Sequence, residues 1–344
     1  MSDQVRIALI GAGRMGSVHL AALLASDAIE LAAIVEPVAA VRSRHDDLGV
    51  PLYETPSELI ADGTAEGVLI AAPSDQHAEL VATFAAAGLP VLCEKPIGVA
   101  IEHTLAAHQA ARAHGVILQV GYWRRFVPEL RALRARIAGG ELGEIYQLSC
   151  MQWDEEPPSA EFRAHCGGIA IDMGVHEFDQ TRWLLGQEFD RVVAMPGGAL
   201  PAAAASPADP DAAVVLAQLS GGAAATISLG RRFPYADSCW LEVWGTEGYE
   251  RLPFMWDADV WAPGSSPVFL AAMEAQADAF ARTIRGAPQE GAGGEDAVAA
   301  VETATRSAAS LGEAATGADA QRSATRADAQ RSEAQPSAAS VSAR

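Results

Sequence analysis

The chain has 344 residues, enough for about two ordinary domains with cores of their own. Half of the residues are hydrophobic and a fifth are charged, a composition typical of a globular protein. The formal net charge of −20 argues against nucleic acid and anionic membranes as partners, because both attract basic surfaces.

The first third of the chain alternates short apolar runs with alanine-rich stretches. The apolar runs predict buried strands at 5–10, 31–35, 68–71, 91–92 and 116–120. The stretches between them predict helices at 17–24, 77–87 and 102–114. This alternation is typical of a doubly wound parallel sheet, so we predict a Rossmann domain of the α/β class over residues 1–121.

After Gly121 the pattern changes to consecutive strands with few helices between them. The predicted strands lie at 145–152, 191–195, 213–219, 224–229 and 238–244. We therefore predict an α+β domain over residues 122–312, with a mainly antiparallel sheet and late helices at 269–285 and 295–311. The final helix is expected to pack back on the first domain.

Two segments have compositions that predict irregular structure. Residues 197–212 are rich in proline and alanine, which favours an exposed loop. Residues 313–344 contain almost no large apolar side chains, so we predict a disordered tail rich in alanine, arginine and serine.

The four cysteines, Cys93, Cys150, Cys166 and Cys239, are scattered and form no CxxC pair. Their spacing favours free thiols in a reducing compartment over a metal site. No basic flank precedes an apolar run at the start, and no apolar run approaches the roughly 18 residues of a membrane span. We therefore expect a cytoplasmic protein.

A glycine-rich turn follows the first predicted strand and opens the first predicted helix. Its sequence, Gly11-Ala12-Gly13-Arg14-Met15-Gly16, has the spacing of a dinucleotide-binding turn, with the pyrophosphate at the helix N-terminus. Glu36 ends the second strand, where a carboxylate accepts hydrogen bonds from ribose hydroxyls and repels a 2′-phosphate. These residues predict NAD in preference to NADP, although Arg14 and Arg42 are nearby cations.

A second loop, Ala71-Ala72-Pro73-Ser74-Asp75-Gln76-His77, follows another predicted strand. Ligands of parallel sheets bind beyond the carboxyl ends of the strands, so we expect this loop to border the cofactor. Ser74 or Asp75 is equally well explained as a helix cap, and His77 as a structural histidine near a helix start.

Lys95 is the only lysine of the chain and stands in the tripeptide Glu94-Lys95-Pro96. Everywhere else this chain uses arginine for positive charge. A retained lysine indicates a need for a compact ammonium on a flexible stem that can transfer a proton, which a guanidinium cannot do. Chance is the alternative, because a single lysine has to lie somewhere.

Asp172 and His176 lie four residues apart, so on a helix they share one face. A carboxylate beside an imidazole orients the ring and raises its basicity, which suits a base that takes a proton from a hydroxyl. A buried structural Asp–His pair explains the same spacing equally well.

These motifs, in this order and spacing, resemble the glucose–fructose oxidoreductase / inositol dehydrogenase / MocA family. The stretch Gly121-Tyr122-Trp123-Arg124-Arg125-Phe126 adds to the resemblance, which covers roughly residues 4–312. Family members combine a Rossmann domain with an open-faced sheet whose outer face often supports oligomerisation. The resemblance implies an NAD(P)-dependent dehydrogenase acting on a secondary hydroxyl of a cyclic polyol or sugar, as a homo-oligomer (dimer or tetramer), without a metal.

The resemblance also implies roles for individual residues. Lys95 is expected near the nicotinamide, bonded to the reacting hydroxyl, and His176 is expected to be the general acid/base. Asp172 is expected to hold both the substrate and the histidine. The implied cofactor site consists of Gly11, Gly13, Arg14, Met15, Gly16, Glu36, Pro73, Ser74, His77, Glu94 and Lys95.

The substrate contacts implied by the resemblance are Trp123, Arg124, Asp154, Asp172, His176 and Tyr235. Trp123 stands where inositol dehydrogenases carry methionine, and the acidic run at 154–158 stands where they carry a histidine-containing stretch. The acidic run favours a neutral hydroxyl-rich ligand or an amine-bearing one, and a solvated loop is its alternative interpretation. Arg124 is expected to donate to ring hydroxyls, or else, like Arg125, to pair with a surface carboxylate.

An inositol is therefore the first expectation for the substrate. Another pyranose, or an amino-cyclitol of a biosynthetic pathway, is the second. A different class of protein, a non-catalytic NAD-sensing regulator of the same fold, would be expected to lack Lys95, Asp172 and His176, and all three are present.

Overall fold

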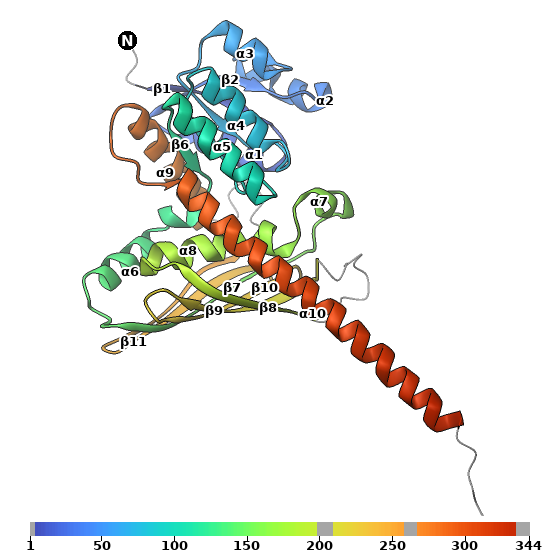
Figure 1. Cartoon of the computed structure of the whole chain (residues 1–344). Helices are drawn as coiled ribbons and strands as arrows, with labels where there is room; N and C mark the ends of the chain where they lie inside the picture. The colour runs from blue at the N-terminus through green and yellow to red at the C-terminus, as the bar shows by residue number, and fades with distance from the viewer. Residues whose placement is uncertain (1–3, 198–208, 258–266, 335–344) are drawn as a thin grey trace, which may run out of the picture.

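The computed structural model describes residues 4–197, 209–257 and 267–334. Two sheets organise this part of the chain, one of seven strands and one of six. Figure 1 shows the seven-stranded sheet and its helices above the six-stranded sheet, with the last helix running past both.

The seven-stranded sheet has the order β13-β6-β5-β4-β1-β2-β3. In chain order, six of its strands are β1 (Val5–Ile10), β2 (Ile29–Val35), β3 (Leu52–Tyr53), β4 (Gly67–Ile70), β5 (Val91–Cys93) and β6 (Leu118–Val120). All pairs among them are parallel, and helices on both faces bury them, which is why they read as continuous apolar runs. The helices are α1 (Arg14–Ala25), α2 (Ala39–Arg42), η1 (Ser43–Leu48), α3 (Pro56–Asp62), α4 (His77–Ala86) and α5 (Ile101–His114).

The six-stranded sheet has the order β12-β11-β7-β10-β9-β8. Its strands are β7 (Ile145–Trp153), β8 (Phe189–Pro196), β9 (Ala212–Leu219), β10 (Ala224–Gly230), β11 (Asp237–Gly245) and β12 (Tyr249–Asp257). Only the β7–β10 pair is parallel, so the predicted mainly antiparallel sheet is confirmed. The segments η2 (Trp123–Phe126), α6 (Pro128–Ala138), α7 (Ala160–His165), η3 (Ala170–Gly174) and α8 (Val175–Leu185) belong to the same half.

The last part of the chain joins the two halves. Helix α9 (Pro267–Ile284) packs on α1, and β13 (Ala292–Gly293) pairs with the edge strand β6. Helix α10 (Gly294–Ala334) then contacts α5 in the first half and α8 and β8 in the second. The parallel sheet therefore receives a strand from far beyond residue 121, and the final helix contacts the first domain, as expected.

Sequence composition predicts irregular structure in two segments; the structure differs from the prediction in the first and describes little of the second. We predict disorder from residue 313, whereas α10 continues through Ala334 and projects beyond the body of the molecule (Figure 1). Alanine, arginine, glutamine and glutamate favour helix by intrinsic propensity, which requires no buried apolar face. The predicted loop at 197–212 falls mainly on residues 198–208, which lie outside the described residues. None of the described helices is long and apolar enough to cross a membrane.

Candidate active site

The glycine-rich turn has the shape that a dinucleotide requires. Gly11 has a φ of +90°, and a side chain there would lie 2.8 Å from the Ala72 nitrogen. A side chain on Gly16 would collide with the Gly11 carbonyl, whereas the space beside Gly13 is open within 4 Å. The turn therefore packs tightly on one side and leaves room on the other for an anion at the start of α1.

Glu36 lies at the end of β2, directly behind this turn. Its carboxylate accepts hydrogen bonds of 2.8 Å from the Ala12 nitrogen and 2.9 Å from the Val38 nitrogen. The side chain is 6% exposed, so its charge is only weakly screened by water. A buried anion at this position accepts ribose hydroxyls and opposes a 2′-phosphate, and the site thus fits NAD.

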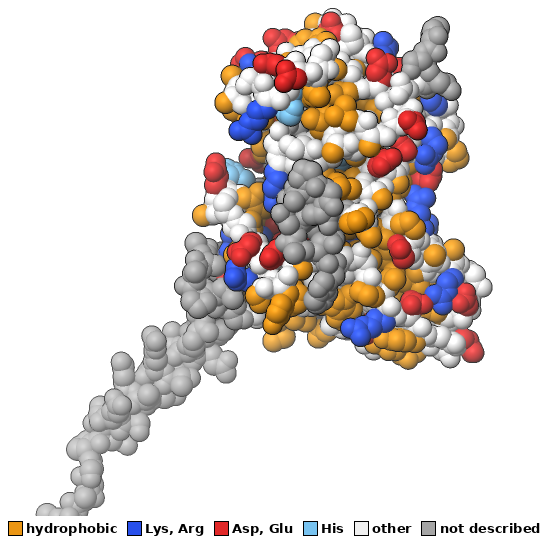
Figure 2. Space-filling view, turned by 180° about the vertical axis from the view of Figure 1, so that it is seen from behind, with side chains coloured by type: hydrophobic (Ala, Val, Ile, Leu, Met, Phe, Trp, Pro, Cys, Tyr) orange, Lys and Arg blue, Asp and Glu red, His pale blue; other side chains and the backbone are white. Residues whose placement is uncertain are grey.

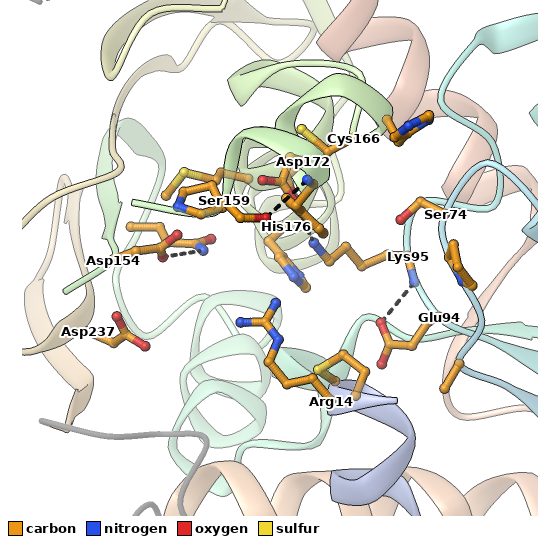
Figure 3. Close-up of a pocket in the computed structure, with 18 of the residues that line it drawn as sticks. Arg14, Ser74, Glu94, Lys95, Asp154, Ser159, Cys166, Asp172, His176 and Asp237 are labelled. Atoms are coloured by element: carbon orange, nitrogen blue, oxygen red, sulfur yellow. Dashed lines mark hydrogen bonds and ion pairs between the residues drawn. The ribbon is translucent and has the colours of Figure 1, made fainter. Parts of the chain in front are cut away.

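A cavity of about 1090 Å³ lies between the two halves of the molecule. Residues of the parallel-sheet half and of the second half face each other across it, as Figure 3 shows for Ser74 and Lys95 opposite Asp154. The predicted site residues in its lining are Arg14, Met15, Pro73, Ser74, His77, Glu94, Lys95, Trp123, Arg124, Asp154, Asp172 and His176. The structure thus brings together most of the residues that the sequence singled out.

Lys95 follows β5 and reaches across the cavity to the second half of the molecule. Its Nζ donates a 2.7 Å hydrogen bond to the main-chain oxygen of Asp172 and lies 3.5 Å from Asp172 Oδ1. The side chain remains 19% exposed. The only lysine of the chain is therefore held in place and still faces the cavity.

The expected contact between Asp172 and His176 is not among the hydrogen bonds of the described residues. Asp172 Oδ2 instead accepts a 2.9 Å hydrogen bond from Arg231, and His176 Nδ1 is buried without a hydrogen-bond partner. The prediction assumed an α-helix, but Asp172 lies in η3, a π-helical turn. The carboxylate of Asp172 is taken up by Arg231, so the four-residue spacing does not produce the expected contact.

His176 is buried at the start of α8, with the rings of Tyr122 and Trp123 around it. Burial, together with the positive charges of Lys95 and Arg124, lowers the pKa of His176 well below its usual value. The imidazole is therefore neutral at neutral pH and able to accept a proton.

Glu94 and His77 fix the two loops on the cofactor side. Glu94 accepts a 3.0 Å hydrogen bond from the Lys95 nitrogen and contacts His19 Nε2 at 2.7 Å. Burial disfavours the charged form of Glu94, but these interactions outweigh it and lower its pKa. The ring nitrogens of His77 contact the main-chain oxygens of Pro96 and Ala72 at 2.8 Å and 2.7 Å, so this histidine joins the loops.

Arg124 lies in the cavity wall, where neighbouring side chains already bind its guanidinium. It pairs with the buried Glu177 and donates to Gln152 Oε1 at 2.9 Å and Cys239 Sγ at 3.2 Å. Trp123 packs edge-on against Phe269, with ring centroids 4.9 Å apart. Arg124 thus pairs with a carboxylate, as in the alternative expectation, but the carboxylate is buried rather than on the surface.

Tyr235 is not in the cavity lining. It is 72% exposed and stacks on Phe233 in the turn before β11. Asp237, two residues later, does line the cavity, and its Oδ1 accepts a hydrogen bond from the Glu155 nitrogen. Of the two residues of this region that the resemblance implies, Tyr235 and Asp237, the cavity lining contains Asp237, with which strand β11 begins.

Asp154 and Asp237 lie near each other in the cavity lining (Figure 3). Burial, with the charges of Asp172 and Asp237, raises the pKa of Asp154 to about 7. Gln152 donates to its Oδ1 at 3.3 Å. Sequence reasoning did not single out Gln152 or Arg231, since nothing local separates them from the other glutamines and arginines.

The chain matches known proteins over most of its length. Residues 5–122 match an oxidoreductase family with an NAD-binding Rossmann fold, and residues 130–250 match the GFO/IDH/MocA C-terminal domain. The chain is 48% identical over 299 residues to the rhizopine catabolism protein MocA of Rhizobium meliloti, covering 87% of this chain and 92% of that protein. It is 33% identical over 244 residues to an inositol 2-dehydrogenase of Rhizobium meliloti, covering 71% and 74%.

Solved structures agree with these matches. A myo-inositol dehydrogenase from Corynebacterium glutamicum has a TM-score of 0.80 to this chain at 29% identity, covering 89% of this chain and 96% of that one. GenD2 from gentamicin A biosynthesis, in complex with NAD, has a TM-score of 0.79 at 25% identity, covering 90% and 95%. The chain therefore belongs to the GFO/IDH/MocA family and is an NAD-binding oxidoreductase.

Proposed function

We propose that this protein oxidises a secondary hydroxyl of a cyclic polyol, with an inositol as the leading substrate, and that it also catalyses the reverse reduction. The observation that carries the proposal is the placement of Lys95 and a buried, neutral His176 in one cavity beside the dinucleotide turn. Relatives named as inositol dehydrogenases support the choice of substrate.

The two side chains divide the proton chemistry between them. When bound, NAD accepts the hydride that leaves the carbinol carbon. His176 accepts the hydroxyl proton, which its lowered pKa allows at neutral pH. Lys95 donates a hydrogen bond to the same oxygen and stabilises the negative charge that develops there. Asp172 keeps Lys95 in place through its carbonyl oxygen.

An amine-bearing cyclitol is the second candidate substrate, and the charge of the cavity favours it. Asp154, Glu155, Glu156, Glu161 and Asp237 all contribute to the lining. A substrate ammonium near Asp154 would favour ionisation of a carboxyl whose pKa is about 7. The relative with 48% identity is named for rhizopine catabolism rather than for inositol oxidation. The experiment below therefore includes amine-bearing cyclitols as well as inositols.

The experiment measures formation of reduced cofactor with NAD, and then NADP, across inositol isomers, common pyranoses and amino-cyclitols. Turnover of an inositol that exceeds turnover of its amino analogue supports the first candidate, and the reverse order supports the second. Lys95→Met is the matched variant, expected to bind NAD and to lose turnover. NAD binding by the wild-type protein without turnover of any compound would contradict the proposal.

We also propose that a second copy of the chain covers the open face of the six-stranded sheet. Val193 and Leu216 pair across β8 and β9, as do Met195 and Val214. They are 43% to 61% exposed. Figure 2 shows hydrophobic side chains along the lower part of the molecule, where this sheet lies. Exposed apolar surface of this kind is typical of a subunit interface.

A further inference from the structure

Arg231 is a buried cation directly after β10, outside the cavity lining. Its side chain is 0% exposed, and its main-chain nitrogen donates to the Asp211 oxygen at 2.8 Å. Burial disfavours the charged guanidinium, but the carboxylates of Asp172 and Asp209 outweigh this and raise the pKa of Arg231. An arginine is costly to bury without such partners, so its position is tied to them.

The carboxylate of Asp172 is shared between two cations. Arg231 Nη1 donates to Oδ2 at 2.9 Å, whereas Lys95 Nζ lies 3.5 Å from Oδ1. The short hydrogen bond from Lys95 goes to the main-chain oxygen of Asp172 instead. The closer partner of the carboxylate is therefore the arginine, and the lysine ammonium is not bound in a tight ion pair.

A second set of contacts fixes Arg231 from behind. Its Nη2 donates to Asp209 Oδ1 at 3.2 Å, and Asp209 also accepts hydrogen bonds from the Ile169 nitrogen at 2.8 Å and from Arg163 Nε at 2.9 Å. Arg163 additionally donates to Asp211 Oδ1 at 2.8 Å. This network connects the start of β9, the end of β10 and the segment before η3. The Asp209 oxygen that accepts from Arg231 is held by the Ile169 nitrogen, whereas Arg163 binds the other oxygen of that carboxylate.

We propose that Arg231 is a positioning residue for the reaction proposed above. It holds the Asp172 carboxylate by Oδ2, so that Asp172 orients Lys95 without binding its ammonium tightly. The inference rests on the proposed function, because Lys95 must remain available to the substrate oxygen. Without Arg231, Lys95 would remain as the cationic partner of Asp172 among the described contacts and would be drawn to the carboxylate.

The test compares Arg231→Gln with Arg163→Gln. Arg163 belongs to the same network but contacts Asp209 and Asp211 rather than Asp172, which makes it a matched control for the loss of a buried cation. We expect Arg231→Gln to lower kcat on the order of 10- to 100-fold, the size of loss that a small displacement of catalytic groups produces. NAD affinity should be unchanged in both variants, and kcat should be near wild type in Arg163→Gln.

A second measurement does not depend on turnover. Because Lys95 is the only lysine, reductive methylation with isotope-labelled formaldehyde marks this side chain and the amino terminus alone, and NMR separates the two signals. An amine drawn against a carboxylate is less open to the reagent, so we expect slower labelling of Lys95 in Arg231→Gln and the wild-type rate in Arg163→Gln. This rate tests the role of Arg231 even if the substrate proposed above is wrong.

Wild-type kcat and labelling rate in Arg231→Gln would overturn the proposal, as would equal changes in Arg163→Gln. Arg231→Lys returns a cation beside Asp172 and should recover part of kcat; it is assessed by kcat alone, because it adds a second lysine to the chain. If Arg231→Gln does not fold, as judged by NAD binding, Arg231→Lys is compared with Arg163→Lys instead. The proposal then requires a lower kcat in Arg231→Lys alone, because a lysine lacks the planar fork that contacts both Asp172 and Asp209.

Discussion

Lys95 Nζ donates a 2.7 Å hydrogen bond to the main-chain oxygen of Asp172, which joins the end of β5 to the turn before α8. A main-chain acceptor fixes the position of the ammonium without neutralising its charge. The two halves of the molecule must therefore be correctly docked before the lysine reaches its place. This contact links the assembly of the cavity to the chemistry proposed in it.

Replacing Lys95 with arginine tests whether charge alone is sufficient. Lys95→Arg keeps the positive charge but replaces the compact ammonium with a larger planar guanidinium. We expect NAD binding to persist and kcat to fall on the order of 100-fold, because the larger group misplaces the hydrogen-bond donor relative to the substrate oxygen. Steady-state kinetics together with an NAD titration measure both. Turnover close to wild type would reduce Lys95 to a source of positive charge.

Replacing His176 tests the proposed general base. We expect His176→Ala to lower kcat by roughly 10²- to 10⁴-fold, the usual contribution of general acid–base catalysis. Because the pKa of His176 is lowered, its neutral form persists below the usual histidine range. The wild-type kcat/KM should therefore stay level around neutral pH and fall only in more acid solution, as the imidazole becomes protonated. In His176→Ala, kcat/KM should not fall in acid solution. If kcat/KM of this variant still falls there, the fall is caused by the protonation of another group.

The fold and the cofactor turn could be predicted because their signals are local. Each strand of a parallel sheet is an apolar run, and Gly11 and Gly16 lie where the backbone permits no side chain. The helix α3 was missed although Thr55 and Glu58 form a capping box at its start, which is a readable signal. Strand β13 was missed because two residues have no periodicity.

Which side chains of the site contact one another depends on the three-dimensional fold, and these contacts cannot be read from the sequence. Asp172 pairs with Arg231 rather than with His176, and the sequence spacing of Asp172 and His176 does not reveal this partner. Arg231 itself lies 59 positions further along the chain, one arginine among many. Residue types therefore predicted a set of residues of which most line one cavity, whereas their pairing required the three-dimensional structure.

Replacing Glu36 tests cofactor choice. Glu36→Ser removes the buried anion at the end of β2, so we expect the preference for NAD over NADP to weaken. NAD binding should also weaken somewhat, because the Ala12 nitrogen loses its 2.8 Å acceptor. Glu54→Ser is the control, since Glu54 is largely exposed, contacts Arg42 and does not touch the turn. The measurement is the ratio of kcat/KM for the two cofactors, and an unchanged ratio in Glu36→Ser would mean that another residue discriminates between them.

Replacing Asp154 tests its raised pKa through stability. The folded protein holds a proton on Asp154 up to about pH 7, whereas the unfolded chain releases it near pH 4. The free energy of unfolding therefore falls as pH rises between these values, by up to about 1.4 kcal/mol per pH unit. We expect Asp154→Asn to raise the unfolding temperature more at pH 8 than at pH 5. The exposed Glu156→Gln should show no such difference, and equal behaviour of the two variants would argue against the raised pKa.

Replacing Leu216 tests the proposed subunit interface. Its side chain is 53% exposed on the open face of the six-stranded sheet, paired across the strands with Val193. We expect Leu216→Arg to shift the wild-type assembly toward the 35.8 kDa monomer, because an unpaired charge is costly to bury between subunits. Leu24→Arg is the control, since Leu24 is equally exposed, at 55%, but lies on α1. Light scattering after size-exclusion chromatography measures the mass. A wild-type monomer, or a Leu216→Arg assembly of unchanged mass, would exclude this face as the interface.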